Sequence, residues 1–324
     1  MLLSIVIPAY NAEKFIEILL KNLTEQINFD TKIKNDCEIL VINDGSKDNT
    51  KEIVEKFETN FSYIRLINQE NKGESGARNT GIENANGDYI YFLDCDDSLT
   101  KGSICHFIKT IEQNPDMDLY CFSYISTVNG NIRKKYVNKK INNKIWNRID
   151  FLKNYLSKKL PIHVCSCIIN KKLIEKCLLR FSVGLRIGED IEWLLNVGSV
   201  IKSAYYSNRI CYIYQIRNDS IMQGYKTYSQ TQYHSFEIRR NIILSENYQT
   251  NELRKYSNFW IENQLLSNIV YYLKSDVKDK EITTALCKDC LLLKLPISKG
   301  NWKNSFMIHI SKFLPLKFIL RLLK

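Results

Sequence analysis

Three carboxylates occur within four residues of the sequence, at Asp94, Asp96 and Asp97. Like charges this close repel one another and raise each other's pKa unless a cation lies between them. Mg²⁺ and Mn²⁺ prefer oxygen ligands and leave coordination positions open for the phosphates of a substrate. The cluster therefore indicates a divalent-metal site. The alternative is that Asp96 and Asp97 only cap the helix that follows.

Two further groups have the chemistry of a nucleotide site. Asp44, in the polar segment 43–46, can accept hydrogen bonds from a base or a ribose. Segment 73–78 offers backbone N–H groups at the start of a helix, and Arg78 adds a guanidinium, a combination that binds anions. The alternative is that Arg78 is a surface residue of that helix.

A second acidic pair, Glu189 and Asp190, follows Gly188 where the pattern starts a helix. Carboxylates in a first helical turn interact favourably with the helix dipole without any ligand. A carboxylate that lines a crevice can instead act as a general base. The spacing is compatible with both roles.

The first 125 residues alternate between apolar strand patterns and helical periodicity. We predict strands at 2–7, 37–42, 63–67, 89–93 and 118–124, and helices at 13–26, 51–57, 71–85 and 101–113. This βαβ series indicates an α/β protein with a parallel sheet and helices on both faces. Ligands bind such sheets beyond the carboxyl ends of the strands, so the polar segments after the first, second and fourth strands should share one crevice.

The pattern changes beyond residue 126. A turn at Asn129 and Gly130 lies between possible strands, and we expect strands at 163–169 and 210–216 with helices at 147–158 and from 188. After about residue 224 the chain is expected to be helical. A Gly-x-Gly-x-x-Gly turn and a Gly-Lys-Ser/Thr loop are both missing from the sequence, which disfavours a dinucleotide-binding fold and a P-loop phosphotransferase.

The net charge of +11 is concentrated in two segments, 119–149 and 294–324, each with seven Lys or Arg and no Asp or Glu. Such an excess indicates an anionic partner surface, and a solvated basic face is the alternative. Ten cysteines in a chain without a secretory leader should be reduced, buried thiols. A zinc site from the pairs 165/167 and 287/290 is a weak alternative.

The segment 306–324 is apolar and basic, and Lys317, Arg321 and Lys324 share one face of a helix. This pattern is typical of an interfacial helix lying on an anionic membrane. Packing on its own domain is the alternative. The sequence has no apolar stretch of transmembrane length, and residues 1–8 are too short for a signal peptide. We therefore expect a cytoplasmic protein, peripheral on the inner face of the cell membrane.

Five segments occur in order that together resemble family 2 glycosyltransferases of the GT-A fold: 4–11 (SIVIPAYN), 41–46 (VINDGS), 76–81 (GARNTG), 92–97 (FLDCDD) and 188–190 (GED). The resemblance is dense over 1–125, thinner to about 220, and not found beyond. It implies an inverting transferase that uses a nucleotide sugar, most often a UDP-sugar, with Mn²⁺ or Mg²⁺.

The resemblance also implies a role for each matching residue. Asp96 would bind the metal, Asp94 would contact both the metal and the ribose, and Asp190 would be the catalytic base. The other residues would bind the nucleotide sugar: Pro8, Ala9, Tyr10, Asp44, Arg78, Arg217 and Ser220. Segment 164–166 (VCS) stands where such sequences often have a tryptophan on the acceptor side.

From these patterns we expect a nucleotide-sugar-binding half at 1–125, an acceptor-side half at 126–222 and a helical C-terminal region at 223–324. The expected reaction is transfer of a hexose or N-acetylhexosamine to a lipid-linked or oligosaccharide acceptor. Its place would be the synthesis of a cell-surface polysaccharide: O-antigen, capsule or lipooligosaccharide. The alternatives are a sugar-nucleotide-forming nucleotidyltransferase and a non-catalytic basic binding protein. We expect no nucleic-acid partner, because no known reader motif is present and the basic segments lie outside the predicted crevice.

Overall fold

The computed structural model describes residues 1–185, 187–217, 227–295 and 298–313. These residues form two compact units. The first unit holds residues 1–147, 162–184 and 200–216, and the second holds 148–161, 185–199 and 217–324. The three-part division expected from the sequence concerns function and stays a prediction.

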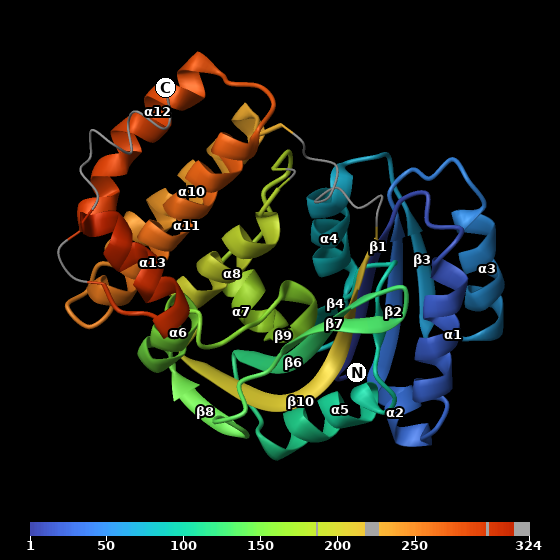
Figure 1. Cartoon of the computed structure of the whole chain (residues 1–324). Helices are drawn as coiled ribbons and strands as arrows, with labels where there is room; N and C mark the ends of the chain where they lie inside the picture. The colour runs from blue at the N-terminus through green and yellow to red at the C-terminus, as the bar shows by residue number, and fades with distance from the viewer. Residues whose placement is uncertain (186, 218–226, 296–297, 314–324) are drawn as a thin grey trace. The chain divides into compact units, whose positions relative to one another are not determined.

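The first unit is built on one sheet of order β3-β2-β1-β4-β9-β6-β10-β5, with β7 on β6 and β8 on β10 (Figure 1). Its strands are β1 (Leu3–Ala9), β2 (Cys37–Asn43), β3 (Ile64–Asn68), β4 (Tyr89–Phe92), β5 (Ser98–Leu99), β6 (Leu119–Val128), β7 (Asn131–Tyr136), β8 (Lys144–Asn147), β9 (Cys167–Asn170) and β10 (Ser203–Ile216).

Strands β1, β2 and β4 are buried along their whole length. Their nearly unbroken apolar sequences reflect a sheet that is covered on both faces. Strand β1 pairs in parallel with both β2 and β4, and β2 pairs in parallel with β3. The predicted parallel sheet is confirmed over these four strands. The α/β prediction also holds for the whole sheet, although β9 enters antiparallel between β4 and β6.

Helices cover both faces of the parallel strands, with α1 and α3 on one side and α4 on the other (Figure 1). The helices of this unit are α1 (Ile16–Ile27), α2 (Thr31–Asp36), α3 (Thr50–Asn60), α4 (Gly73–Asn84), α5 (Ser103–Gln113) and α7 (Lys171–Lys176), with a 3₁₀ turn at Val164–Ser166. Helix α4 approaches β1 closely at Gly81, where a Cβ would lie 2.1 Å from Cγ1 of Val6. A glycine is needed there, and the close approach fixes α4 over the sheet.

The hairpin predicted at residues 129–130 is confirmed. Asn129 and Gly130 both have positive φ, at 50° and 77°, and β6 and β7 pair antiparallel on either side. Two consecutive turn residues with positive φ give the turn a backbone twist that matches the right-handed twist of the strands on either side. The strand predicted at 163–169 starts only at Cys167, because His163 caps a 3₁₀ turn instead: its Nδ1 accepts a hydrogen bond from the Cys165 N–H at 3.2 Å.

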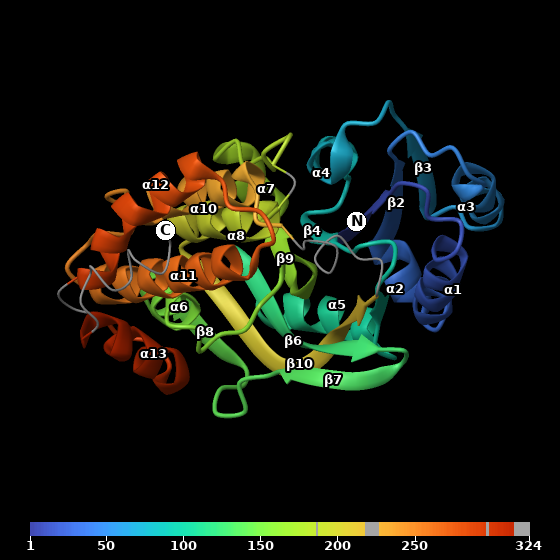
Figure 2. The same cartoon turned by 45° about the horizontal axis from the view of Figure 1, so that its top comes forward.

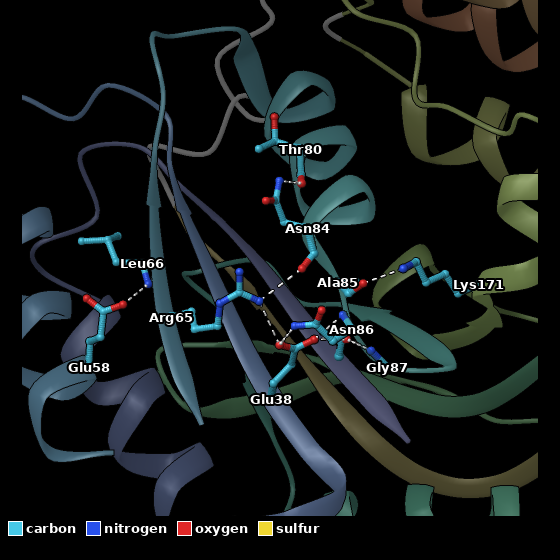
Figure 3. A network of polar contacts seen from close by, with 11 residues as sticks. Glu38, Glu58, Arg65, Leu66, Thr80, Asn84, Ala85, Asn86, Gly87 and Lys171 are labelled. Carbon is cyan, nitrogen blue, oxygen red and sulfur yellow. Dashed lines mark hydrogen bonds and ion pairs between the residues drawn. The ribbon is translucent and has the colours of Figure 1, made fainter. Parts of the chain in front are cut away.

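A buried carboxylate joins three elements at the amino end of the parallel strands (Figure 3). Glu38 on β2 is 2% exposed and accepts hydrogen bonds from Ser4 Oγ at 2.6 Å and from the Asn86 N–H at 2.6 Å. The Asn86 side chain and Arg65 also donate to it, at 3.0 and 3.2 Å. This network holds the turn between α4 and β4 against the sheet and so helps to fix the start of β4.

The second unit is helical, as predicted for the C-terminal region. Its helices are α6 (Arg148–Leu156), α8 (Glu189–Val200), α10 (Gln230–Leu244), α11 (Arg254–Lys274), α12 (Lys280–Asp289) and α13 (Trp302–Phe313), with a 3₁₀ helix at Cys290–Lys294. Side chains from α10, α11, α12 and the 3₁₀ helix form one apolar core, for example Phe236, Leu265, Ile269, Leu286 and Leu293. No helix within the described residues is both long and apolar enough to span a membrane.

Helix α13 contains the described part of the predicted membrane-binding tail, and it lies beside α11 (Figure 2). Ile308 is fully buried, and Nζ of Lys312 lies 2.9 Å from the buried carboxylate of Glu262 on α11. Phe306 and Ile310 are 64% and 42% exposed. Residues 306–313 therefore pack one side on their own unit, as the alternative stated. Lys317, Arg321 and Lys324 lie outside the described residues.

Candidate active site

The first unit gathers polar loops at the carboxyl ends of its parallel strands. Ala9 and Asn43 are register partners at the ends of β1 and β2, and the Asp44 N–H donates to the Ala9 carbonyl at 2.9 Å. Asp94 follows two residues after β4, which also pairs with β1. One edge of the sheet thus carries six of the predicted residues, namely Pro8, Ala9, Tyr10, Asp44, Asp94 and Asp96.

The loop after β1 ends on an exposed aromatic ring. Tyr10 is 49% exposed, and Asn11 behind it has a positive φ of 49°. Asn11 is held by the next loop, since its N–H donates to Ser46 Oγ at 3.0 Å and its Oδ1 accepts from the Lys47 N–H at 2.9 Å. These contacts fix the loop while its aromatic ring stays available to a ligand.

Asp44 is buried and connects the second loop to the entry of α4. It is 3% exposed, and its Oδ1 accepts hydrogen bonds from Gln69 Nε2 at 2.6 Å and from the Lys72 N–H at 2.8 Å. The structure therefore gives Asp44 an anchoring role toward α4, and its predicted contact to a base stays a prediction.

Arg78 is a buried residue of α4, so its interpretation as a surface residue is wrong. It is 1% exposed, donates to Oδ1 of Asp94 at 2.8 Å and also pairs with Glu74. Its Cζ lies 5.1 Å from the ring centre of Phe181, a cation–π distance. Glycine at position 81 brings α4 close to the sheet, and this places Arg78 against the acidic segment.

Burial alone would raise the pKa of Asp94, but neighbouring groups hold it below its ordinary value. The Arg78 guanidinium is the first of these, followed by the charge of His163 and a hydrogen bond from the Cys165 thiol. The last two residues were not predicted. The available signal was the segment 164–166, where the resemblance predicted an acceptor-side position.

Asp97 does not cap a helix. Helix α5 starts at Ser103 with Gly102 before it and has no side-chain cap, so the capping alternative is wrong. Asp97 instead accepts hydrogen bonds from the Tyr212 hydroxyl and, at 2.7 Å, from the Gln215 N–H. Burial, followed by the charges of Asp94 and Asp96, raises its pKa well above the ordinary value. These hydrogen bonds connect the acidic segment to β10. The neighbouring Asp96 is half-buried.

The acidic segment leaves few protein ligands for a metal. Within the described ranges, no group of three or more His, Cys, Asp or Glu side chains is arranged to hold an ion. Asp94 is engaged by Arg78, and Asp97 by Tyr212 and Gln215. A cation that takes one or two carboxylates and completes its shell with substrate phosphates and water is compatible with this donor set.

The acidic pair at 189–190 belongs to the second unit. Both residues lie in the first turn of α8, and Oδ1 of Asp190 accepts a hydrogen bond from the Ile191 N–H at 2.7 Å. Asp190 is half-buried. Arg217, also half-buried, follows directly after β10, and Ser220 lies outside the described residues.

Residues 4–178 match the family model described as glycosyl transferase family 2. The chain belongs to this family. The resemblance read from the sequence motifs is confirmed.

Two relatives and one solved structure illustrate the similarity. The uncharacterized glycosyltransferase EpsJ of Bacillus subtilis is 30% identical over 226 residues, which are 68% of this chain and 63% of that one. The minor teichoic acid biosynthesis protein GgaB of Bacillus subtilis is 27% identical over 253 residues, which are 74% of this chain and 26% of that one. The matches thus span less than two thirds of either relative.

The crystal structure of S. aureus TarS 1-349 in complex with UDP-GlcNAc superposes with a TM-score of 0.70 at 18% identity, covering 99% of this chain and 90% of that one. At this identity the similarity concerns the fold. The GT-A fold predicted from the sequence is confirmed.

Proposed function

We propose that this protein is an inverting glycosyltransferase that moves a hexose or N-acetylhexosamine from a nucleotide sugar to a lipid-linked or oligosaccharide acceptor. The observation that carries the proposal is the pair of the buried Arg78 with the half-buried Asp94, two residues before Asp96, at the edge of the sheet that also carries Asp44. A guanidinium and half-buried carboxylates at this edge are the groups that a diphosphate and its cation require.

A UDP-sugar is the proposed donor. The exposed ring of Tyr10, with Pro8 and Ala9 behind it, would line the pocket for the base, and Asp44 would accept a hydrogen bond from it. The TarS structure of the same fold was determined with UDP-GlcNAc, which supports a uridine nucleotide. Arg217 and Ser220 would bind near the diphosphate.

Mn²⁺ or Mg²⁺ is the proposed cofactor, with Asp96 as the main ligand and Asp94 as a second one. The half-buried Asp96 follows the pair of Asp94 with Arg78, so a cation held here would lie among charges of both signs. When bound, the cation would neutralise negative charge on the leaving diphosphate. Arg78 keeps Asp94 ionised and oriented, and Asp97 fixes the loop through β10.

Asp190 is the proposed general base. It would take the proton of one acceptor hydroxyl while that oxygen attacks the sugar from the face opposite the diphosphate, which inverts the anomeric centre in a single displacement. The proposal is supported by the position of this half-buried carboxylate in the first turn of α8.

The proposed biological setting is the synthesis of a cell-surface polysaccharide, such as O-antigen, capsule or lipooligosaccharide, on the inner face of the membrane. The similarity to a protein named for minor teichoic acid biosynthesis supports this setting. The basic residues of 314–324, with the exposed Phe306 and Ile310, would contact anionic lipid.

A donor screen tests the proposal. The full chain is incubated with UDP-, GDP- and dTDP-sugars in the presence of Mn²⁺, Mg²⁺ or EDTA, and the released nucleotide is measured. We expect metal-dependent release of UDP from one or a few UDP-sugars. Nucleotide release from GDP-sugars only would overturn the proposed donor. Undiminished nucleotide release in EDTA would overturn the proposed metal dependence.

A further inference from the structure

Helix α10 carries a buried guanidinium that none of the sequence motifs includes. Arg239 is 7% exposed and lies on the apolar face of the helix, three residues after Phe236 and four before Ile243. Burying a guanidinium is unfavourable unless neighbouring groups compensate it. Among the described residues, no oxygen accepts a hydrogen bond from its buried Nε. Arg239 is therefore not explained as a fully bonded structural arginine.

The guanidinium packs directly on the residue before the acidic pair. A Cβ at Gly188 would lie 2.1 Å from Nη1 of Arg239 and 2.8 Å from its Cζ. Gly188 also has a φ of +73°, which favours glycine in its own right. One turn earlier on α10, the Ser235 hydroxyl donates a hydrogen bond to the Ile187 carbonyl. Helix α10 thus contacts residues 187 and 188 through two of its side chains, Ser235 and Arg239.

The charges around Arg239 link it to the acidic pair. Burial lowers its pKa, and Asp190 is the strongest of the opposing charges, followed by the hydroxyls of Tyr155 and Tyr228 and by Glu189. Lys158 adds a like charge, and it too interacts with both Arg239 and Asp190. The carboxylate of Asp190 therefore lies in the field of two cations.

We propose that Arg239 is a positioning residue for Asp190, setting the direction of segment 187–190 at the start of α8. This inference rests on the proposed role of Asp190 as the general base. The guanidinium holds the Gly188 backbone in place by packing, and so fixes where the carboxylate two residues later can lie. Arg239 itself touches no substrate in this proposal.

The test compares Arg239→Gln and Arg239→Lys with Arg240→Gln. Arg240 is a matched control, because it is the next residue of the same helix but pairs with Asp289 and Glu237. We expect Arg239→Gln to lower kcat by about tenfold or more, a share of the roughly 10²- to 10⁴-fold that a positioned base contributes, with the KM for the donor little changed. Arg239→Lys should restore part of the loss. Arg240→Gln should keep kcat per folded molecule.

A double variant separates positioning from a general folding defect. Because Asp190→Asn already removes the base, adding Arg239→Gln should lower kcat only slightly further. Two losses that multiply would overturn the inference, as would equal losses for Arg239→Gln and Arg240→Gln. If Arg239→Gln does not fold, Ser235→Ala, which removes one hydroxyl from the same contact, takes its place. An unchanged kcat in Ser235→Ala and in Arg239→Lys would then overturn the inference.

The two proposals can fail separately. Near-normal turnover by Asp190→Asn would overturn the proposed role of Asp190 as the base, and with it the positioning role of Arg239. Loss of turnover by Asp190→Asn, together with a normal kcat in Arg239→Gln, keeps the base and removes only the positioning role.

Discussion

Arg78 Nη2 donates a hydrogen bond of 2.8 Å to Oδ1 of Asp94, and 2% of the Arg78 side chain is exposed. The pair joins α4 on one face of the sheet to the segment that follows β4. It gives the acidic segment a fixed positive partner within the protein. The half-buried Asp96 lies two residues further along this segment, and it is the proposed main ligand of the cation.

Replacing Arg78 with Met should destabilise the protein. The substitution leaves Asp94 partly buried without its guanidinium, and breaking such a pair costs roughly 3–5 kcal/mol. We expect the free energy of unfolding, measured by urea denaturation, to fall by about that amount. Arg180→Met is the matched control, since Arg180 lies 4.0 Å from the exposed Glu83 and its loss should change stability by about 1 kcal/mol or less. Equal losses in both variants would contradict a special role for the Arg78–Asp94 pair.

Glu38→Gln should weaken the fold in a pH-dependent way. Burial alone would raise the pKa of Glu38, but hydrogen bonds from Ser4, Asn86 and Arg65 lower it below 4.5. A lowered folded-state pKa stabilises the protein above the unfolded-state value, and this stabilisation disappears as the pH falls through the folded-state value. We expect Glu38→Gln to reduce the free energy of unfolding by roughly 2–3 kcal/mol at neutral pH.

The difference between the wild type and Glu38→Gln should shrink as the pH falls below 4.5. Urea denaturation across this range measures it. Glu58→Gln is the control, because Glu58 makes a single exposed hydrogen bond to the Leu66 N–H (Figure 3). If the difference in the free energy of unfolding between the wild type and Glu38→Gln does not change with pH, Glu38 does not stabilise the fold as an ionised carboxylate.

Asp96→Ala should remove most transfer while the fold remains intact. The half-buried Asp96 is the proposed ligand of the divalent cation, and the variant would lose its carboxylate. We expect the metal concentration that gives half-maximal activity to rise strongly, or activity to vanish. Activity against Mn²⁺ and Mg²⁺ concentration measures this, and denaturation curves verify folding. An unchanged metal dependence would remove Asp96 from its role.

Asp190→Asn should retain donor binding and lose turnover. The amide keeps the size of the carboxylate but cannot take a proton, so kcat should fall by about 10²- to 10⁴-fold. Transfer assays together with a UDP-binding titration separate the two effects. Turnover close to the wild-type value would exclude Asp190 as the base.

Changing Lys317, Arg321 and Lys324 together to Ser should weaken binding to anionic vesicles. Each basic residue near an anionic surface contributes about 1 kcal/mol, so the triple variant should bind far more weakly. Vesicles of phosphatidylglycerol and phosphatidylcholine serve in a sedimentation assay, and Lys134→Ser with Lys135→Ser on the exposed strand β7 is the control. Equal binding by the wild type and the triple variant would count against the membrane contact.

The sequence by itself determined the α/β architecture of the first 125 residues. Runs such as β1 and β2 are mostly apolar and buried along their whole length, and the helices between them show clear periodicity. Apolar runs and helical periodicity depend only on residues close together in the sequence, so a single sequence is enough to detect them. The motifs also determined the family, because five short segments in order identify it together.

Only the tertiary structure decided which polar residues meet. It buried Arg78 against Asp94, moved Asp97 from a helix cap to a contact with Tyr212, and placed Arg239 on Gly188. These contacts join residues far apart in the sequence, and helical periodicity places Arg239 on a buried face without showing what lies opposite. Sheet order and helix packing bring such partners together, and no local pattern of the sequence encodes that choice.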